Sequence, residues 1–258
     1  SRNGDLVQGM HIEFSPGDFF IHGQNIGVLG SNVGHSLIKE VEIEIGGQKI
    51  DKHYGHWMET WAELTEPNDI GYINDFTNQV LTKGTKFQNM SGFGGMNGSA
   101  NTDLKAPIFI PLFFWFCRNP GLALPLIALQ YHEVKLNVQF KKNPDNSKAN
   151  TFGQTCVFCD YIFLDTDERR RFAQVSHEYL IEQTQRVHSD TIASGYTDSI
   201  YSASLSINHP VKELIWYIQN TGLTNESRFN FKRYEGVISQ ASSAHDQIST
   251  GQLKLNGH

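Results

Sequence analysis

Cys156 and Cys159 have a spacing that could do chemistry, because CxxC occurs in zinc sites and in redox enzymes. A structural zinc ion needs four ligands, and only Cys117 remains to add to this pair. On a strand, positions i and i+3 also face opposite sides of the sheet. The spacing therefore predicts buried, unpaired cysteines that bind no metal.

His53 and His56, close to Asp51, have the residue types of a metal site. An enzymatic site on a strand would present an HxH pair, whose side chains share one face, with Glu and His ligands downstream. This pair is spaced HxxH and follows a turn. We therefore predict turn and surface histidines.

Asp165, Asp167 and Glu168 cluster like the carboxylates of a two-metal nuclease. The same residues suit the positive N-terminal end of a short helix, where Asp165 and Glu168 make a capping-box pattern. Capping is the interpretation that the sequence favours. Residues 169–171, three arginines, are then expected on a solvated or inter-domain face.

Residues 92–98 are rich in glycine, but no strand precedes them and no helix follows, as a dinucleotide site requires. The sequence contains no GxxxxGK[ST] or GxSxG motif, and no Ser/His/Asp set can be singled out. We therefore expect no catalytic residue, no cofactor-binding residue and no metal ligand, and predict that the protein is not an enzyme.

The composition of the 258 residues excludes further classes. With 21 Lys+Arg against 27 Asp+Glu the net charge is −6, which argues against direct nucleic-acid binding. The 17 Phe, 9 Tyr and 4 Trp supply enough apolar surface for a folded core. Three cysteines are too few for a disulfide framework, so a reducing compartment is expected.

Alternation of apolar and polar residues with period two dominates the chain. It is clearest at 132–140, where every second residue is apolar or His and the others are polar or charged. Many short strands separated by turns are typical of an all-β sandwich or barrel. The predicted strands are 6–14, 41–48, 108–116, 132–140, 155–164, 178–187, 199–207, 211–219 and 252–255.

Helical signals are short. Trp57, Trp61 and Leu64 recur at i, i+4 and i+7, which predicts a helical excursion within 54–80. The capping box predicts a second short helix at 165–175. Residues 82–106 are predicted to form a long exposed loop.

A weak internal repeat relates the two ends of the chain. A strand, a variable loop and a strand with a turn begin at Leu6 and again at Val211, an offset of 211 − 6 = 205 residues. Two copies of one β-domain are predicted, and a complete pair would need about 410 residues. The chain is then expected to begin inside one copy and stop inside the other.

Several long segments resemble the major capsid proteins of nucleocytoplasmic large DNA viruses, the iridovirus, phycodnavirus and mimivirus-like group. The likeness covers nearly the whole chain, in the order that the family shows. The segments are 1–7, 41–65, 113–140 (FFWFCRNPGLALPLIALQYHEVKLNVQF), 165–185, 208–219 and 253–258.

The resemblance implies a double jelly roll, two eight-stranded antiparallel β-sandwiches in tandem, with short helical insertions. Residues 1–164 would form most of the first jelly roll without its N-terminal strands. Residues 165–177 would be a short helical linker, and 178–258 the N-terminal part of a truncated second jelly roll.

The resemblance also implies a structural function, that of a major capsid subunit. Three chains would form a homotrimeric, pseudo-hexagonal capsomer, and capsomers would tile an icosahedral shell. The implied partners are neighbouring capsomers and minor capsid proteins, with an internal viral membrane nearby, and no nucleic acid, small-molecule substrate or cofactor. The implied location is the virion, and the host cytoplasm during assembly. Trp57 and Trp61 are expected either to anchor trimer contacts or to pack in the core.

Two alternatives remain open at this stage. A jelly-roll binding module, either lectin-like or a minor capsid or spike component, would have one jelly roll and a shallow aromatic site. A cupin-type metalloenzyme would bind metal stoichiometrically, and the spacing of His53 and His56 argues against it.

Overall fold

A computed structural model describes most of the first two thirds of the chain and shorter stretches beyond it. The described residues are 4–14, 33–66, 107–141, 154–187, 201–218, 233–234, 244–245 and 250–255. The predicted loop at 82–106 and the end of the helical excursion, from 67 to 80, lie outside them. Within these residues, no helix is long and apolar enough to cross a membrane.

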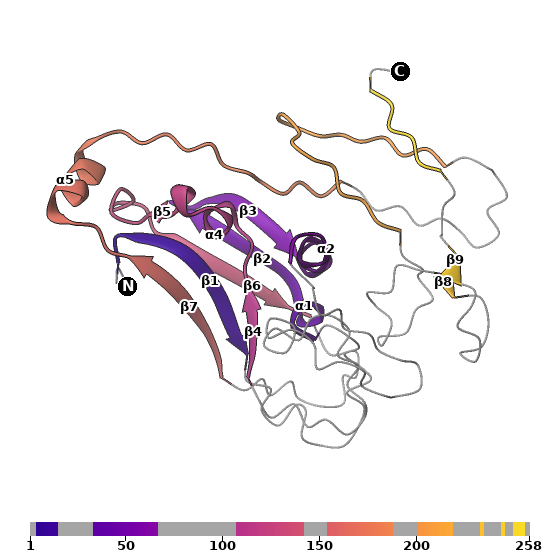
Figure 1. The fold of residues 1–258 in the computed structure, drawn as a ribbon, viewed down its shortest axis with the longest axis horizontal. Helices are drawn as coiled ribbons and strands as arrows, with labels where there is room; N and C mark the ends of the chain where they lie inside the picture. Colours follow the sequence, from indigo (N-terminus) through magenta and orange to yellow (C-terminus); the bar gives the residue numbers. More distant parts are fainter. Residues whose placement is uncertain are drawn as a thin grey trace.

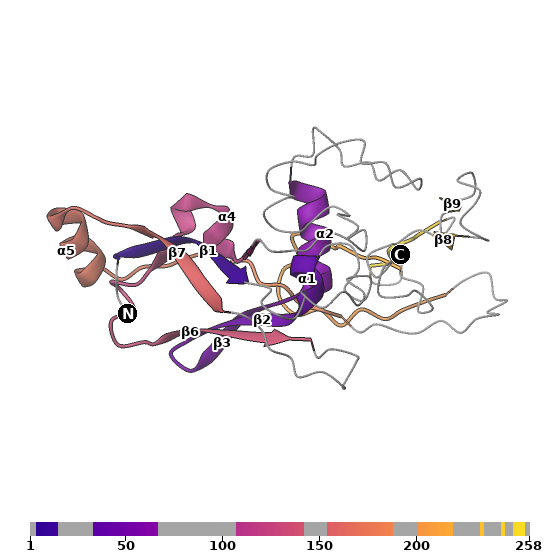
Figure 2. The ribbon, with the colours of Figure 1, turned by 90° about the horizontal axis from the view of Figure 1, so that it is seen from below.

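Two antiparallel sheets form the body of the molecule. In the first, β1 pairs with β4 and β5 along one edge and with β7 along the other; the second has the order β3-β2-β6. The two sheets lie as layers, one above the other, in Figure 2. The bounds are β1 Leu6–Phe14, β2 Ile38–Ile45, β3 Gln48–Tyr54, β4 Ile108–Pro111, β5 Leu124–Pro125, β6 Val134–Phe140 and β7 Thr155–Ile162 (Figure 1).

The core lies between the sheets and is built by the predicted alternation. Ile12 and Phe14 of β1 and Val41 and Ile43 of β2 are each 0% exposed. On β6 the apolar residues are half-buried while the polar ones between them are exposed, as the pattern at 132–140 predicts. Two sheets whose apolar faces pack against each other form a β-sandwich, so the predicted all-β architecture is confirmed for the described residues.

The turn between β2 and β3 contains only Gly46 and Gly47 and sets the register of this hairpin. Their φ angles are +59° and +85°, a region that favours glycine. Ile45 pairs with Gln48 across the turn. Two residues with positive φ make the tight turn that matches the twist of paired strands.

Short helices cover the ends of the sandwich. The helix α2 confirms the predicted helical excursion in its first part, and α5 confirms the helix predicted at 165–175. Buried His35 of α1 and Glu59 of α2 lie 2.7 Å apart and join these two helices. Burial holds the pKa of His35 well below its ordinary value. The helices are α1 Val33–Leu37, α2 Gly55–Thr65, α4 Trp115–Arg118 and α5 Thr166–Gln174, with a 3₁₀ turn, η3, at Pro120–Leu122.

The predicted strand at 108–116 is wrong in its second half. The strand β4 ends at Pro111, and the chain turns into α4. All five residues from 112 to 116 are buried, whereas an alternating strand buries only every second side chain. A short apolar run does not distinguish a buried strand from a buried helical turn, which explains the error.

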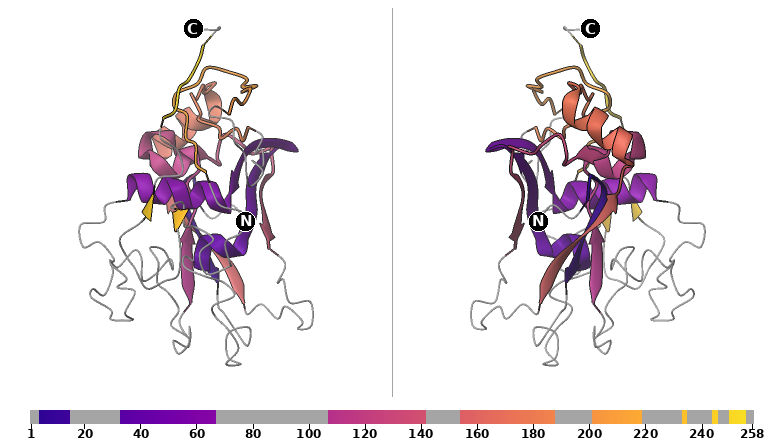
Figure 3. Two further views of the ribbon diagram at one scale, coloured as in Figure 1. Left: turned by 90° about the vertical axis from the view of Figure 1, so that its right-hand side faces the viewer. Right: turned by 90° about the vertical axis from the view of Figure 1, so that its left-hand side faces the viewer.

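The strands predicted after residue 177 are wrong for the described residues. Segments 176–187, 201–218 and 250–255 are extended but form no ladder there, and the short pair β8 Arg233–Tyr234 and β9 Ala244–His245 stands apart. Alternation indicates an extended backbone, whereas a strand also needs a hydrogen-bonded neighbour. Figure 3 shows the first two segments on the side of the sandwich where α2 and α5 lie.

We predict that Gly55→Ala destabilises the sandwich. A methyl group at this position would overlap the backbone carbonyl oxygens of His35 and Ile38, which cannot move aside as a flexible side chain can. The expected loss in the free energy of unfolding is about 1–3 kcal/mol, measured by equilibrium urea unfolding.

Gly251→Ala is the matched control, because its methyl group would meet only the Trp216 side chain at an ordinary 3.5 Å. If the two variants unfold with equal free energies, the close approach of Gly55 to the carbonyl oxygens of His35 and Ile38 would be contradicted.

Candidate functional site

Asp51 and His53 occupy the interior, which corrects the prediction of a surface turn for His53. Both lie on β3 with fully buried side chains, and His53 Nε2 is 2.8 Å from Asp51 Oδ2. The imidazole lies between the rings of Trp57 and Phe114, with centroid distances of 4.2 and 4.6 Å. The turn seen in the sequence is Gly46-Gly47, and the strand that follows it carries the histidine inward.

The second oxygen of Asp51 binds a segment far away in the sequence. Asp51 Oδ1 accepts hydrogen bonds from the backbone N–H of Lys52 and of Thr184, each 2.9 Å long. Beside it, Gln183 Nε2 donates to the carbonyl oxygen of Ile50 at 2.5 Å. Residues 176–187, called the strap below, thus follow α5 and dock on β3.

The strap also contacts α4 and the end of β3 through charged and aromatic groups. Glu182 Oε2 lies 3.1 Å from Arg118 Nη1, and the Arg118 guanidinium carbon lies 4.8 Å from the centre of a Trp61 ring. The Arg186 guanidinium lies 4.9 Å from the Tyr54 ring centre. The strap is therefore attached along its length by three kinds of contact.

Residues 201–218 contact both the strap and α2, where the rings of Tyr217 and His56 stack with centroids 6.0 Å apart. The backbone N–H of Asn208 donates to Gln185 Oε1 at 3.1 Å, and Lys212 pairs with Glu182. Lys212 and Arg118 hold the pKa of Glu182 below its ordinary value. The later part of the chain is therefore joined to the first sandwich through the strap and through the contact of Tyr217 with α2.

The helix α5 is fixed at its start by two carboxylates. Asp165 Oδ1 accepts the N–H of Glu168 at 2.8 Å, which confirms the capping interpretation. Asp5 Oδ2 accepts from the N–H of Leu164 at 2.8 Å and from Arg169 Nη2 at 2.9 Å. These donors hold the pKa of Asp5 below its ordinary value. Their stabilising effect is therefore present above about pH 3.9 and is lost as the pH falls through the lower, folded-state pKa.

Trp57 and Trp61 are half-buried and pack within the chain. Their rings stack on each other, with centroids 5.5 Å apart and planes at 8°. Both contact the core cluster, and Trp61 lies under Arg118. Of the two roles expected for these tryptophans, core packing is the one that the geometry shows.

The three cysteines are free and half-buried rather than fully buried. Cys159 and Cys117 pack against the core, and burial raises the pKa of the Cys117 thiol to about 12. Cys156 pairs in register with Glu13, and Cys159 with Met10. Cys156 and Cys159 are three residues apart on the regular strand β7, so their thiols lie on opposite faces of the sheet, as predicted. Among the described residues, no group of three or more His, Cys, Asp or Glu is placed to hold a metal ion.

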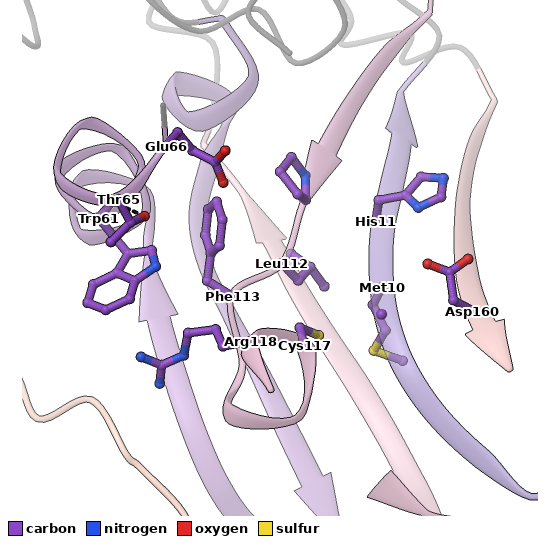
Figure 4. Close-up of a pocket in the computed structure, with 12 residues that line it drawn as sticks. Met10, His11, Trp61, Thr65, Glu66, Leu112, Phe113, Cys117, Arg118 and Asp160 are labelled. Atoms are coloured by element: carbon purple, nitrogen blue, oxygen red, sulfur yellow. Dashed lines mark hydrogen bonds between the residues drawn. The ribbon is translucent and has the colours of Figure 1, made fainter. Parts of the chain in front are cut away.

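A groove of about 530 Å³ separates α2 from β1 and β7. Two carboxylates, Glu66 at the end of α2 and Asp160 on β7, stand on opposite sides of an apolar floor (Figure 4). A Cβ at Gly9 would lie 2.7 Å from Asp160 Oδ2, so glycine lets this carboxylate lie over β1. The lining residues are Gly9, Met10, His11, Trp61, Thr65, Glu66, Pro111, Leu112, Phe113, Cys117, Arg118 and Asp160.

Neither the strap contacts nor the groove was predicted from the sequence. The strap joins residues 133 positions apart, from Asp51 to Thr184, and period-two patterns carry no information on such pairs. The one available signal was the run of arginines at 169–171, expected on a solvated or inter-domain face. All three arginines are exposed, as the solvated alternative predicts, and Arg169 also pairs with Asp5.

Comparisons with known proteins agree on one group. A family described as "Major capsid protein N-terminus" matches residues 1–165, and one described as "Large eukaryotic DNA virus major capsid protein" matches 168–258. The chain is 42% identical over 260 residues to a major capsid protein of Pyramimonas orientalis virus, covering 100% of this chain and 56% of the relative. It is 39% identical over 245 residues to a major capsid protein of Paramecium bursaria Chlorella virus 1, covering 87% and 50%.

A solved structure has a similar fold. The quasi-atomic capsid structure of the same Chlorella virus, PBCV-1, matches with a TM-score of 0.55 and 38% identity. The match covers 78% of this chain and 45% of that chain. The chain therefore spans about half the length of the relatives that it matches.

We predict that Asp51→Ala releases the strap. The variant removes the acceptor for the Thr184 N–H, and such a lost hydrogen bond costs about 1–3 kcal/mol. Trypsin cleavage after Arg186 is expected to accelerate several-fold, as followed by mass spectrometry of the fragments.

Glu44→Ala is the control, because Glu44 lies on the neighbouring strand β2 and its side chain is half-exposed. An unchanged cleavage rate in Asp51→Ala would show that Asp51 does not hold the strap.

Proposed function

Because the chain belongs to the major capsid protein family of large eukaryotic DNA viruses, we propose that it acts as a structural subunit of an icosahedral virion shell. The observation that carries the proposal is the pair of family matches, which together include residues 1–165 and 168–258. The similar proteins are named capsid proteins, so the lectin-like alternative is not favoured.

The sandwich suits a structural function. Its two sheets bury their inner faces against each other, and residues such as Ile12, Phe14 and Phe114 are 0% exposed. Close-packed interiors are stiff, and a shell needs subunits that keep their shape while many weak contacts form between them. The family's structural role also supports the proposal that the protein is not an enzyme.

We infer a division into three parts. Residues 1–164 form most of a first jelly roll, 165–177 a helical linker, and 178–258 the N-terminal part of a second. The position of α5 between β7 and the strap supports this division. In this arrangement the strap holds the second part against the first, through Asp51 and Arg118.

The assembly follows from the same proposal. Three copies form a capsomer with a pseudo-hexagonal outline, and capsomers contact one another and minor capsid proteins, with an internal membrane nearby. The subunit assembles in the host cytoplasm and resides in the virion. A ring of three needs two different, complementary patches on each copy, because a threefold contact is heterologous.

We predict that the full-length protein is a trimer in solution. Size-exclusion chromatography coupled to light scattering should give about three times the mass of the denatured chain. A monomer at micromolar concentration would overturn the trimeric capsomer.

A further inference from the structure

The strap covers the free edge of β3, which is the last strand of its sheet within the described residues. Gln183 Nε2 donates to the carbonyl oxygen of Ile50 at 2.5 Å, near the middle of β3. The Arg186 guanidinium lies 4.9 Å from the ring centre of Tyr54, at the end of β3. The strap therefore runs in the same direction as β3, as Figure 1 also shows. In the part of the chain that the structure describes, it forms no backbone ladder with this strand.

The Asp51 carboxylate takes the place of a ladder bond between the strap and β3. Its Oδ1 accepts the backbone N–H of Lys52 on β3 and that of Thr184 on the strap, each at 2.9 Å. The carbonyl of Ile50 and the N–H of Lys52 belong to alternate residues, whose backbone groups point to the same side of a strand. Both groups therefore point away from β2, and the strap occupies the position that a further strand would take.

The lysines of β3 give this edge little protection of their own. A free edge strand is a ready-made site for pairing with another chain, and uncompensated lysines on the edge oppose such pairing by their charge. On β3, the Nζ atoms of Lys52 and Lys49 lie 3.2 and 3.3 Å from Glu42 Oε2. Lys52 Nζ also lies 3.5 Å from Glu40 Oε1. Because carboxylates of β2 offset both lysines, protection of the edge depends on the strap.

We propose that the strap prevents β3 from pairing edge to edge with β3 of a second copy of this chain. Without the strap, the backbone groups of β3 that point away from β2 form an antiparallel ladder with the same groups of the second copy. Two identical edges are self-complementary across a twofold axis, because each strand offers the other the same donors and acceptors. The inference goes beyond the proposed function and does not depend on it, because it rests only on contacts within one chain.

Proline at position 184 tests the proposal, because proline has no backbone N–H to donate to Asp51. Thr184→Ala is the matched control, since alanine keeps the N–H. In the full-length protein, trypsin cleavage after Arg186 reports release of the strap, and size-exclusion chromatography with light scattering reports association. For Thr184→Pro we expect cleavage to accelerate several-fold and the mass to rise about twofold above that of the unmodified protein as the concentration increases. Thr184→Ala should match the unmodified protein in both measurements.

Two further substitutions in the Thr184→Pro protein test whether β3 forms the new contact. Lys52→Pro removes an N–H that points to the edge, which an edge strand tolerates, and should return the mass to that of the unmodified protein. Lys52→Ala removes the same ion pairs but keeps the N–H, so the mass should stay raised. Glu42→Gln introduces no proline and leaves the lysines of each edge less compensated, so it should lower the excess mass.

Three results would overturn the proposal. They are unaccelerated cleavage of Thr184→Pro, an unchanged mass despite accelerated cleavage, and association that persists undiminished with both Lys52→Pro and Glu42→Gln. Association of misfolded protein gives the third result, because it does not need the edge of β3. The mass of the unmodified protein tests the proposed trimer, whereas only the differences between variants test the strap, so the two proposals fail separately.

Discussion

The carboxylate of Asp51 imposes the constraint on which the arrangement of the two parts of the chain depends. Its side chain is fully buried, in a region packed with aromatic rings. A buried polar atom is costly unless it makes a hydrogen bond. Two donors bind Oδ1 of this carboxylate, the N–H of Lys52 from its own strand and the N–H of Thr184 from the strap, while Oδ2 lies 2.8 Å from His53 Nε2. The sandwich therefore has a buried acceptor, Asp51 Oδ1, whose second hydrogen bond comes from the strap.

The other contacts of the strap depend on this anchor. When the Thr184 N–H is bonded to Asp51 on β3, Glu182 lies beside Arg118 and pairs with it. The guanidinium group of Arg118 in turn lies over the Trp61 ring. Lys212 then pairs with Glu182, and Tyr217 stacks on His56 of α2, so residues 201–218 contact both the strap and α2. At the other end, the pair of Asp5 and Arg169 fixes the start of α5. Exposed ion pairs are individually weak, so the buried hydrogen bond sets the position and the charged pairs reinforce it.

Local features of the fold could be predicted from the sequence, whereas contacts between distant segments could not. The strand β6 and the cap of α5 follow from alternation and from Asp165 with Glu168, which act over a few residues. Residues 112–116 were wrongly predicted as a strand. All five are buried and apolar or aromatic, so the sequence shows neither the period of a strand nor that of a helix. The burial of His53 was missed, because a histidine near a turn gives no signal of the rings that enclose it. The resemblance to capsid proteins gave the family, and the comparisons confirm it.

Hydrogen exchange of the Thr184 backbone amide tests most directly that Asp51 anchors the strap. In the native full-length protein this amide is expected to exchange as slowly as the amide of Lys52, since both donate to the same carboxylate oxygen. The amides of the strap residues flanking it should exchange faster wherever they point to solvent. Fast exchange at Thr184 with slow exchange at Lys52 would show that β3 is folded while the strap is not docked, and would contradict the account.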